Sequence, residues 1–140
     1  RIAQFSHPNI ISVLETEDQK EFVEPLSGQY FSYMLMELAP YGALCEIVQN
    51  PAFGADQKLV RTYFHQLIDA IEYTHNHGLA HLDIKLENLV MGKNYELKLI
   101  DFDSCYYIEE DTQIGKGTQN YRAPELVAMN VKNPQACDVF

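Results

Sequence analysis

Positive charge is scarce in this sequence. Its 140 residues include 10 lysines and arginines against 20 aspartates and glutamates, which gives a formal net charge of −10. Such a surface repels phosphate backbones and anionic lipid headgroups, so we expect no nucleic-acid partner and no membrane partner. Phosphate chemistry in this chain would therefore depend on metal ions and a few local donors.

Cysteine is also sparse, and no uncharged apolar run approaches the roughly 18 residues that a membrane-spanning helix needs. The three cysteines, Cys45, Cys105 and Cys137, lie far apart with no CxxC pair. This pattern indicates reduced thiols in a cytoplasmic or nuclear compartment. His75 and His77 have no Cys or carboxylate cluster beside them at zinc spacing, so we interpret them as surface residues near a helix end.

Hydrophobic residues make up 46% of the chain, which is enough for one compact domain and too much for an intrinsically disordered polymer. There is no internal repeat and no low-complexity linker. The sequence begins with Arg1 rather than Met and has no signal peptide, so we expect it to be a piece of a longer protein.

The first part of the chain predicts a hairpin. A helix tail over 1–5 stops before a proline, and an apolar stretch over 10–14 is followed by acidic residues. A turn at Ser27-Gly28 precedes a second strand over 30–38. A short helix is expected over 43–49.

The strongest helix signal follows Gly54. Asp56 is a suitable N-cap, and Gly78 marks the C-terminal end. Between them, apolar residues recur at helical spacing and form one wide face: Leu59, Val60, Tyr63, Phe64, Leu67, Ile68 and Ile71. Two short strands, over 89–91 and 96–100, are expected downstream of this helix.

A dense group of functional side chains lies around these two strands. Segment 81–88 contains the carboxylate of Asp83, the ammonium of Lys85 and the carboxamide of Asn88 within six residues. Thirteen residues after Asn88, Asp101-Phe102-Asp103 follows an apolar strand. Phosphoryl transfer needs such a set: oxygen ligands for Mg²⁺, a base near the acceptor hydroxyl and a cation near the migrating phosphoryl group.

This arrangement resembles the protein kinase family along the whole chain. The family's HRDLKxxN catalytic loop is matched by His81, Asp83, Lys85 and Asn88, and its metal-binding DFG triplet is matched by Asp101 and Phe102. The block that closes the family's activation segment is matched by Gly117-Thr118, Tyr121 and Ala123-Pro124-Glu125, so the three motifs follow in the family's order. Three further segments resemble the link from helix C to strand 4, strand 5 with the hinge, and the start of helix F: 7–11, 34–39 and 137–140.

The resemblance implies an α+β, protein kinase-like bilobal fold that is incomplete. Residues 1–38 would form the end of helix C and strands 4 and 5 of the N-lobe. Residues 39–140 would form the hinge, helices D and E, the catalytic loop, the activation segment and the start of helix F. The rest of the kinase domain would be a partner in cis.

The resemblance also implies ATP and Mg²⁺ as cofactors and a protein as substrate. Asp83 would orient the substrate hydroxyl and accept its proton. Lys85 would lie beside the γ-phosphoryl group of the nucleotide and balance its charge. Asn88 and Asp101 would hold the magnesium ions.

By the same resemblance, the adenine ring would bind at the hinge. The backbone of Glu37 and Ala39 would bind the adenine edge, with Met36 as gatekeeper behind it. Leu44 and Val90 would pack below the ring.

The remaining resemblance concerns the substrate loop and the reaction type. Thr118 and Tyr121 fall in this loop, and Lys85 together with Thr118 is the form found in serine/threonine kinases. The implied function is therefore ATP-dependent phosphorylation of protein Ser and Thr hydroxyls. His81 would be structural, packing under Phe102.

The sequence departs from the family pattern at two motif positions. Leu82 replaces the arginine that in many kinases receives an activation-loop phosphate, which predicts activity independent of phosphorylation in the loop, where Thr112 is available. Asp103 replaces the glycine of DFG. Its carboxylate could weaken a flip to an inactive state, add a metal contact or disturb ATP binding, and the sequence does not decide between these.

Some expected parts of the domain are missing from the sequence. It contains no glycine-rich phosphate loop, no strand-3 lysine and no helix-C glutamate. The apolar face of the helix over 56–78 is expected to need helix F for its burial. We therefore expect the isolated 140 residues to be inactive and at best loosely folded.

Two other functions fit parts of the sequence. A small-molecule phosphotransferase of the choline or aminoglycoside kinase type would share the loop around Asp83 and the Ile100–Asp103 segment. Lys85 and the block over 118–125, which suits a docked polypeptide, argue against it. A pseudokinase that acts as a scaffold or regulator is favoured by Leu82 and Asp103, but the intact catalytic motifs argue against it.

Overall fold

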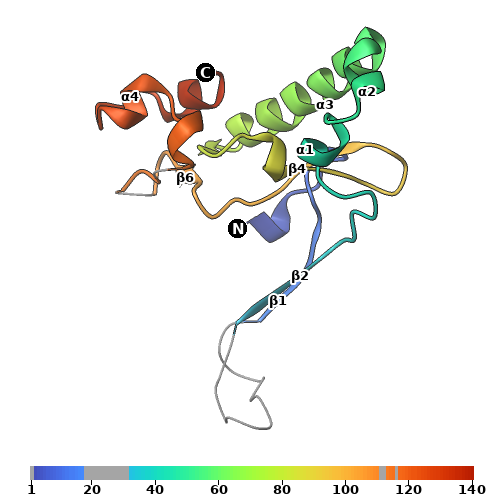
Figure 1. Cartoon of the computed structure of the whole chain (residues 1–140). Helices are drawn as coiled ribbons and strands as arrows, with labels where there is room; N and C mark the ends of the chain where they lie inside the picture. The colour runs from blue at the N-terminus through green and yellow to red at the C-terminus, as the bar shows by residue number, and fades with distance from the viewer. Residues whose placement is uncertain (1, 18–31, 111–112, 116) are drawn as a thin grey trace, which may run out of the picture.

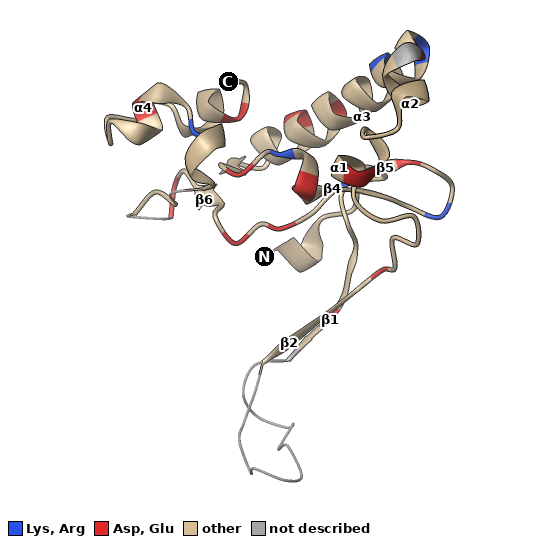
Figure 2. Ribbon diagram, viewed as in Figure 1, with Lys and Arg blue, Asp and Glu red and all other residues tan. Residues whose placement is uncertain are grey.

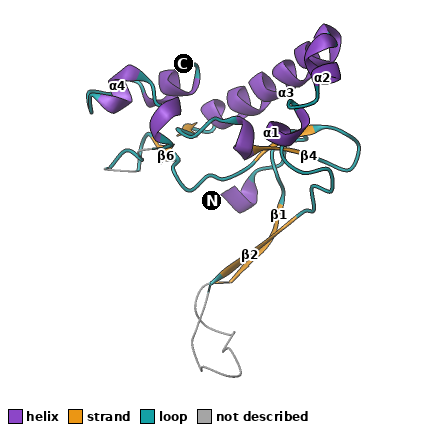
Figure 3. Ribbon diagram, viewed as in Figure 1, coloured by secondary structure: helices purple, strands orange, loops and turns teal. Residues whose placement is uncertain are grey.

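The computed structural model describes residues 2–17, 32–110, 113–115 and 117–140, which form an α+β structure (Figures 1 and 3). The strands are β1 (Val13–Glu17), β2 (Tyr33–Met36), β3 (Leu79–Ala80), β4 (Leu89–Met91), β5 (Leu97–Leu99) and β6 (Tyr106–Tyr107). The α-helices are α1 (Leu44–Ile47), α2 (Pro51–Ala55), α3 (Gln57–Asn76) and α4 (Pro124–Val127). Short 3₁₀ turns are η1 (Ile2–Gln4), η2 (Leu86–Asn88), η3 (Gln119–Tyr121) and η4 (Pro134–Asp138).

The strands form three separate antiparallel pairs: β1 with β2, β3 with β6, and β4 with β5. The β1–β2 hairpin projects away from the helical part of the molecule, as Figure 1 shows. An α+β class and a hairpin were both expected from the sequence and are confirmed. The proposed division between residues 38 and 39 stays a prediction.

The first strand of the hairpin does not lie where the apolar pattern placed it. We expected the stretch 10–14, whereas β1 runs from Val13 into the acidic segment. The reason is that Ile10 and Ile11 pair elsewhere: Ile10 forms a parallel bridge with Leu99, and the Ile11 N–H donates to Leu99 O over 3.0 Å. The turn predicted at Ser27-Gly28 lies outside the described residues.

Helix α3 confirms the capping signals. Asp56 Oδ1 accepts a hydrogen bond from the backbone N–H of Leu59 over 3.0 Å, and Gly78 has a φ of +72° just after the helix end. Helix α2 was not predicted, although Asn50 and Pro51 carry the appropriate signals. Asn50 Oδ1 accepts from Ala52 N over 3.0 Å, and proline is favoured in a first helical turn.

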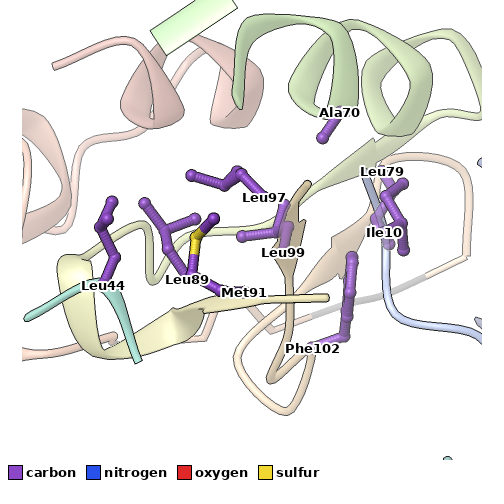
Figure 4. Close-up of a cluster of buried hydrophobic side chains, with 9 residues drawn as sticks. All are labelled: Ile10, Leu44, Ala70, Leu79, Leu89, Met91, Leu97, Leu99 and Phe102. Carbon is purple, nitrogen blue, oxygen red and sulfur yellow. The ribbon is translucent and has the colours of Figure 1, made fainter. Parts of the chain in front are cut away.

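The main hydrophobic core lies between α3 and the β4–β5 pair (Figure 4). Ile10 and Leu99 are 1% and 0% exposed, so the parallel bridge between them is at the centre of this core. The nine buried residues are Ile10, Leu44, Ala70, Leu79, Leu89, Met91, Leu97, Leu99 and Phe102. β4 and β5, the strands next to the predicted catalytic motifs, are therefore held in place by this core.

A second group of buried residues lies toward the C-terminal end of the described chain. We call it the C-terminal cluster, and it consists of Ala80, Leu82, Ala123, Leu126 and Cys137, with Tyr106, Ile114 and Val131 packed against it. It joins β3, the catalytic loop, α4 and η4.

Apolar side chains remain exposed on several elements, among them α3 and β2. On α3, Val60, Phe64 and Ile68 are 39%, 60% and 44% exposed. On β2, Met34 and Leu35 are 50% and 49% exposed. Among the residues that the structure describes, no helix combines the length and the apolar character required to cross a lipid bilayer.

Candidate active site

Three of the predicted site residues, the two predicted catalytic residues and one predicted metal ligand, are joined by direct hydrogen bonds. Asp83 is buried in the loop between β3 and η2. Lys85 Nζ donates to Asp83 Oδ2 over 2.8 Å, and Asn88 Nδ2 donates to the same oxygen over 3.0 Å. Asn88 Nδ2 also donates to the backbone carbonyl of Asp83 over 2.9 Å. The loop thus positions a carboxylate, an ammonium and a carboxamide at one place.

The substrate loop predicted from the sequence contacts this group. The backbone N–H of Thr118 donates to Asp83 Oδ1 over 2.7 Å, and Lys85 Nζ donates to Thr118 Oγ1 over 2.6 Å. Tyr121 lies farther out, with its hydroxyl 3.5 Å from Glu87 Oε2. Lys85 therefore bridges the predicted base and the loop on which a polypeptide would dock.

These contacts control the pKa of Asp83. Burial raises the pKa of this carboxyl group, but the hydrogen bonds from Lys85 and Thr118 outweigh it and lower the pKa from 3.8 to about 2. The hydrogen bond to Asp83 correspondingly raises the pKa of Lys85. Both groups are therefore charged at neutral pH, as a hydroxyl-orienting carboxylate and a phosphoryl-binding cation need to be.

Asp101 comes to the same region through the backbone. The Ile100 N–H donates to the carbonyl of Asn88 over 3.0 Å, which fixes the start of the DFD triplet beside the catalytic loop. Asp101 is exposed and has a φ of +62°, whereas Phe102 is buried and packs edge-on against His81 with ring centroids 4.7 Å apart. The left-handed turn at Asp101 thus separates an exposed carboxylate from a buried ring.

Met36 and Asp101 border one cavity of about 410 Å³ between the hairpin and the DFD triplet. Its other lining residues are Ile2, Ile11, Val13, Met34, Ile100, Phe102 and Asp103. The residue predicted as gatekeeper and the residue predicted as metal ligand therefore face a common space.

Asp103 has a different conformation from the one that a glycine position suggests. The positive φ lies at Asp101, and Asp103 is an exposed turn residue whose N–H is 3.4 Å from Asp101 Oδ1. The substitution of glycine by aspartate at this position therefore costs no left-handed strain.

The carboxylate of Asp138 accepts two hydrogen bonds from the backbone of the catalytic loop. Its Oδ2 accepts from the His81 N–H over 2.8 Å, and its Oδ1 accepts from the Leu82 N–H over 2.7 Å. These bonds compensate for the strained backbone of Leu82, which has a φ of +64°. His81 Nε2 lies 3.0 Å from Ile100 O, and desolvation lowers the pKa of its imidazole. The structural role predicted for His81 fits this environment.

The predicted adenine-binding residues lie along the connection from β2 to α1. The Glu37 N–H donates to Ser12 O over 2.9 Å, which fixes this residue just after the end of β2. Leu44 is buried, and Val90 pairs with Ala43 through an isolated bridge, which brings the two predicted ring-packing residues together. Ala39 is half-buried in the same connection.

Lys98 was not identified from the sequence. It is 6% exposed in β5, and its Nζ lies 2.9 Å from Glu37 Oε1, 3.5 Å from Glu96 Oε1 and 3.1 Å from Pro8 O. Burial raises the pKa of Glu37, but the hydrogen bonds from Lys98 and Ser12 lower it overall. The available signal was a lysine between two leucines in an apolar strand, because a buried ammonium requires partners.

The donors at this site fit Mg²⁺ carried by a nucleotide. Magnesium prefers oxygen ligands and is usually held by one or two carboxylates together with substrate phosphates. The Asn88 amide nitrogen is directed at Asp83, so its oxygen is the atom left for a cation, and Asp101 adds an exposed carboxylate. Within the described ranges no three His, Cys, Asp or Glu side chains gather into a group that could hold a metal ion.

Acidic residues are spread over helices and loops alike, whereas basic residues are few (Figure 2). Lys85 is therefore a basic residue in a mostly acidic chain, and its position beside Asp83 is one of the few places where a phosphate group would meet a cation.

Comparison with known proteins agrees with this geometry. The family model described as "Protein kinase domain" matches residues 1–140. CBL-interacting protein kinase 9 of Oryza sativa subsp. japonica is 34% identical over 140 residues, covering 96% of this chain and 28% of that protein. The probable serine/threonine-protein kinase RTK1 of Saccharomyces cerevisiae is 36% identical over 136 residues, covering 92% of this chain and 22% of the relative. The chain thus spans about a quarter of the length of these relatives.

Proposed function

This chain belongs to the protein kinase domain family, and from that membership we propose that the protein containing it transfers the γ-phosphoryl group of ATP to Ser and Thr hydroxyls of protein substrates. The observation that carries the proposal is the hydrogen-bonded group of Asp83, Lys85, Asn88 and Thr118. It joins the machinery for phosphoryl transfer directly to a polypeptide-docking loop.

Each side chain in this group has a chemical role in the proposal. Asp83 orients the substrate hydroxyl and accepts its proton, and its low pKa keeps it ionised for this purpose. Lys85, which is held between Asp83 and Thr118, offsets negative charge on the migrating phosphoryl group. Since Asp83 is a weak base, its contribution is mainly the positioning of the hydroxyl.

ATP and Mg²⁺ are part of the proposal. Asn88 and Asp101 would hold Mg²⁺, which bridges the phosphates and neutralises part of their charge. The adenine ring would bind at the carbonyl of Glu37 and the N–H of Ala39, between Met36 and the pair formed by Leu44 and Val90.

The serine/threonine assignment rests on Lys85 and Thr118. The bond from Lys85 Nζ to Thr118 Oγ1 links the two residues that mark this form of the family. One of the two relatives named above, RTK1, is described as a probable serine/threonine-protein kinase, which supports the same assignment. We also propose that the remainder of a kinase domain lies in the same chain, that the substrate is a protein, and that the protein is located in the cytoplasm or the nucleus.

The decisive experiment uses the full-length protein and its Asp101→Asn variant. We expect phosphotransfer to a mixed Ser/Thr peptide pool to fall by at least about 10³-fold, because a metal-binding carboxylate is lost, while the thermal midpoint stays within a few degrees. Asp69→Asn, the same chemical change on the exposed surface of α3, is the control and should leave turnover unchanged.

Two outcomes would contradict the proposal. Equal turnover by Asp101→Asn and wild type removes the metal-binding role of Asp101. A folded wild-type protein that binds MgATP but transfers no phosphoryl group to any peptide identifies a pseudokinase instead.

A further inference from the structure

Ile114 lies in the segment before the substrate loop and is half-buried against the C-terminal cluster. This cluster contains Leu82, the residue that follows His81 in the catalytic loop, and Tyr106 of β6 packs against it as well. An aliphatic side chain of the activation segment is therefore packed against the same apolar group that includes the catalytic loop.

The chain that follows Ile114 lies very close to the backbone of two other segments. A Cβ atom at Gly115 would collide with the carbonyl oxygen of Ser104, and one at Gly117 would collide with the carbonyl oxygen of Leu82. Gly117 also has a φ of +56°, a conformation that residues with a side chain rarely adopt. The two glycines thus permit a close approach to the carbonyl groups of Ser104 and Leu82. They have no side chain that could hold the loop in that position.

The contacts after Gly117 place the substrate loop on the catalytic loop. Arg122 donates to Gly117 O through Nη2 over 2.8 Å and through Nε over 3.2 Å. The next residue, Thr118, makes the bonds to Asp83 and Lys85 described above. Ile114 is the apolar contact on the N-terminal side of this docked stretch, and Arg122 is the polar contact on its C-terminal side.

The C-terminal cluster, against which Ile114 packs, is in contact with acidic groups. Two carboxylates contact members of the cluster: Asp138 Oδ1 accepts from Leu82 N, and Glu125 Oε1 is 3.7 Å from Cys137 Sγ. Burial is the main cause that raises the pKa of the Cys137 thiol to about 11, and the nearby carboxylate of Glu125 is the second cause, so this thiol is neutral. A phosphate placed beside these carboxylates would be repelled.

We propose that Ile114 is a positioning residue that holds Gly117 and Thr118 on Asp83 through apolar packing against the C-terminal cluster, without a phosphate. This inference rests on the proposed kinase function, because it assigns how the substrate loop of that function is kept in place. Because Ile114 is half-buried, it gains only part of the effect of full burial, and we expect its truncation to weaken loop docking by up to about tenfold.

The test compares Ile114→Ala and Ile114→Leu in the full-length protein. We expect Ile114→Ala to raise the KM for a peptide substrate by up to about tenfold, while the KM for ATP changes less than about twofold. Ile114→Leu should restore the peptide KM to within about threefold of wild type, because it conserves apolar volume. Val127→Ala, a comparable truncation at an exposed position of α4, is the control and should change neither KM.

A second readout does not require activity. Hydrogen exchange at the Thr118 amide, which is bonded to Asp83, should accelerate by up to about tenfold in Ile114→Ala, while amides of α3 keep their protection. Unchanged Thr118 exchange, or equal acceleration in Thr118 and α3, contradicts the positioning role. Absence of phosphotransfer in the wild type together with selective Thr118 exchange contradicts the proposed function alone.

Discussion

Thr118 donates its backbone N–H to Asp83 Oδ1 over 2.7 Å, although the two residues are 35 positions apart in the chain. This bond joins the loop on which a polypeptide would dock to the carboxylate that would orient the hydroxyl of that polypeptide. Because Lys85 Nζ contacts both residues, the three groups form a closed set of contacts. These contacts therefore fix the position of the Thr118 loop relative to the Asp83 carboxylate.

The low pKa of Asp83 gives a prediction about acid stability. Burial raises this pKa, but the bonds from Lys85 and Thr118 lower it from 3.8 to about 2. The ionised carboxylate thus stabilises the folded state above the unfolded pKa, and this contribution is lost as the pH falls toward 2. In Lys85→Met the pKa of Asp83 should rise, so the loss should begin at a higher pH.

Carboxyl ¹³C NMR titration of Asp83 in the full-length protein measures this directly. Lys58→Met removes an exposed ammonium from α3 and is the matched control. An Asp83 pKa in Lys85→Met that equals the wild-type value would show that Lys85 does not stabilise the ionised form.

Activity should not depend on phosphorylation of Thr112, a residue outside the described ranges. Leu82 provides no guanidinium at the position where many kinases bind a loop phosphate, and it is buried in the C-terminal cluster instead. Thr112→Ala should therefore change kcat/KM for a peptide by less than about twofold, as should phosphatase treatment of the wild type. A loss of more than about tenfold in either experiment would contradict this prediction.

Several features of the fold were accessible from local patterns in the sequence. Asp56 and Gly78 predicted the ends of α3 because capping depends on nearby residues. The strand over 89–91 was predicted with its correct bounds, and the catalytic loop was located by its spacing. Each of these signals lies within a few residues of the structure that it specifies.

The features that were missed depend on contacts between distant segments. Ile10 pairs with Leu99, so the apolar pattern alone placed the first strand too early. The ion pair between Lys98 and Glu37 joins residues 61 positions apart, and nothing near Lys98 in the sequence specifies its partner. The left-handed backbone at Asp101 was also not predicted, because the sequence alone does not show which residue of the DFD triplet adopts it.

The pair formed by Glu37 and Lys98 should contribute measurable coupling. Lys98 is 6% exposed, so removing Glu37 leaves the buried ammonium of Lys98 with a weaker set of partners. A double-mutant cycle with Glu37→Gln and Lys98→Met in the full-length protein should give a coupling free energy of about 0.5–3 kcal/mol in urea unfolding. The matched cycle with Glu96→Gln should give less, since Glu96 Oε1 is 3.5 Å from Nζ. Coupling that is equal in both cycles would contradict a specific role for Glu37.

The isolated 140 residues should lack a cooperative native state. Phe64 on α3 is 60% exposed and Met34 on β2 is 50% exposed, so both elements present apolar surface to water. At about 25 cal/mol per Å², an uncovered helix face removes several kcal/mol from a total stability of about 5–15 kcal/mol. We expect a broad thermal transition, strong binding of a hydrophobic dye and no phosphotransfer. A sharp transition with measurable phosphotransfer would be the opposite result.

We propose that Asn88 and Asp101 bind one nucleotide-associated metal ion beside Asp83. Anomalous diffraction from crystals of the full-length protein with Mn²⁺ and a non-hydrolysable ATP analogue would locate this metal ion. We expect a manganese peak in contact with both the Asn88 side-chain oxygen and the Asp101 carboxylate. A nucleotide bound with its metal away from these two side chains would contradict it.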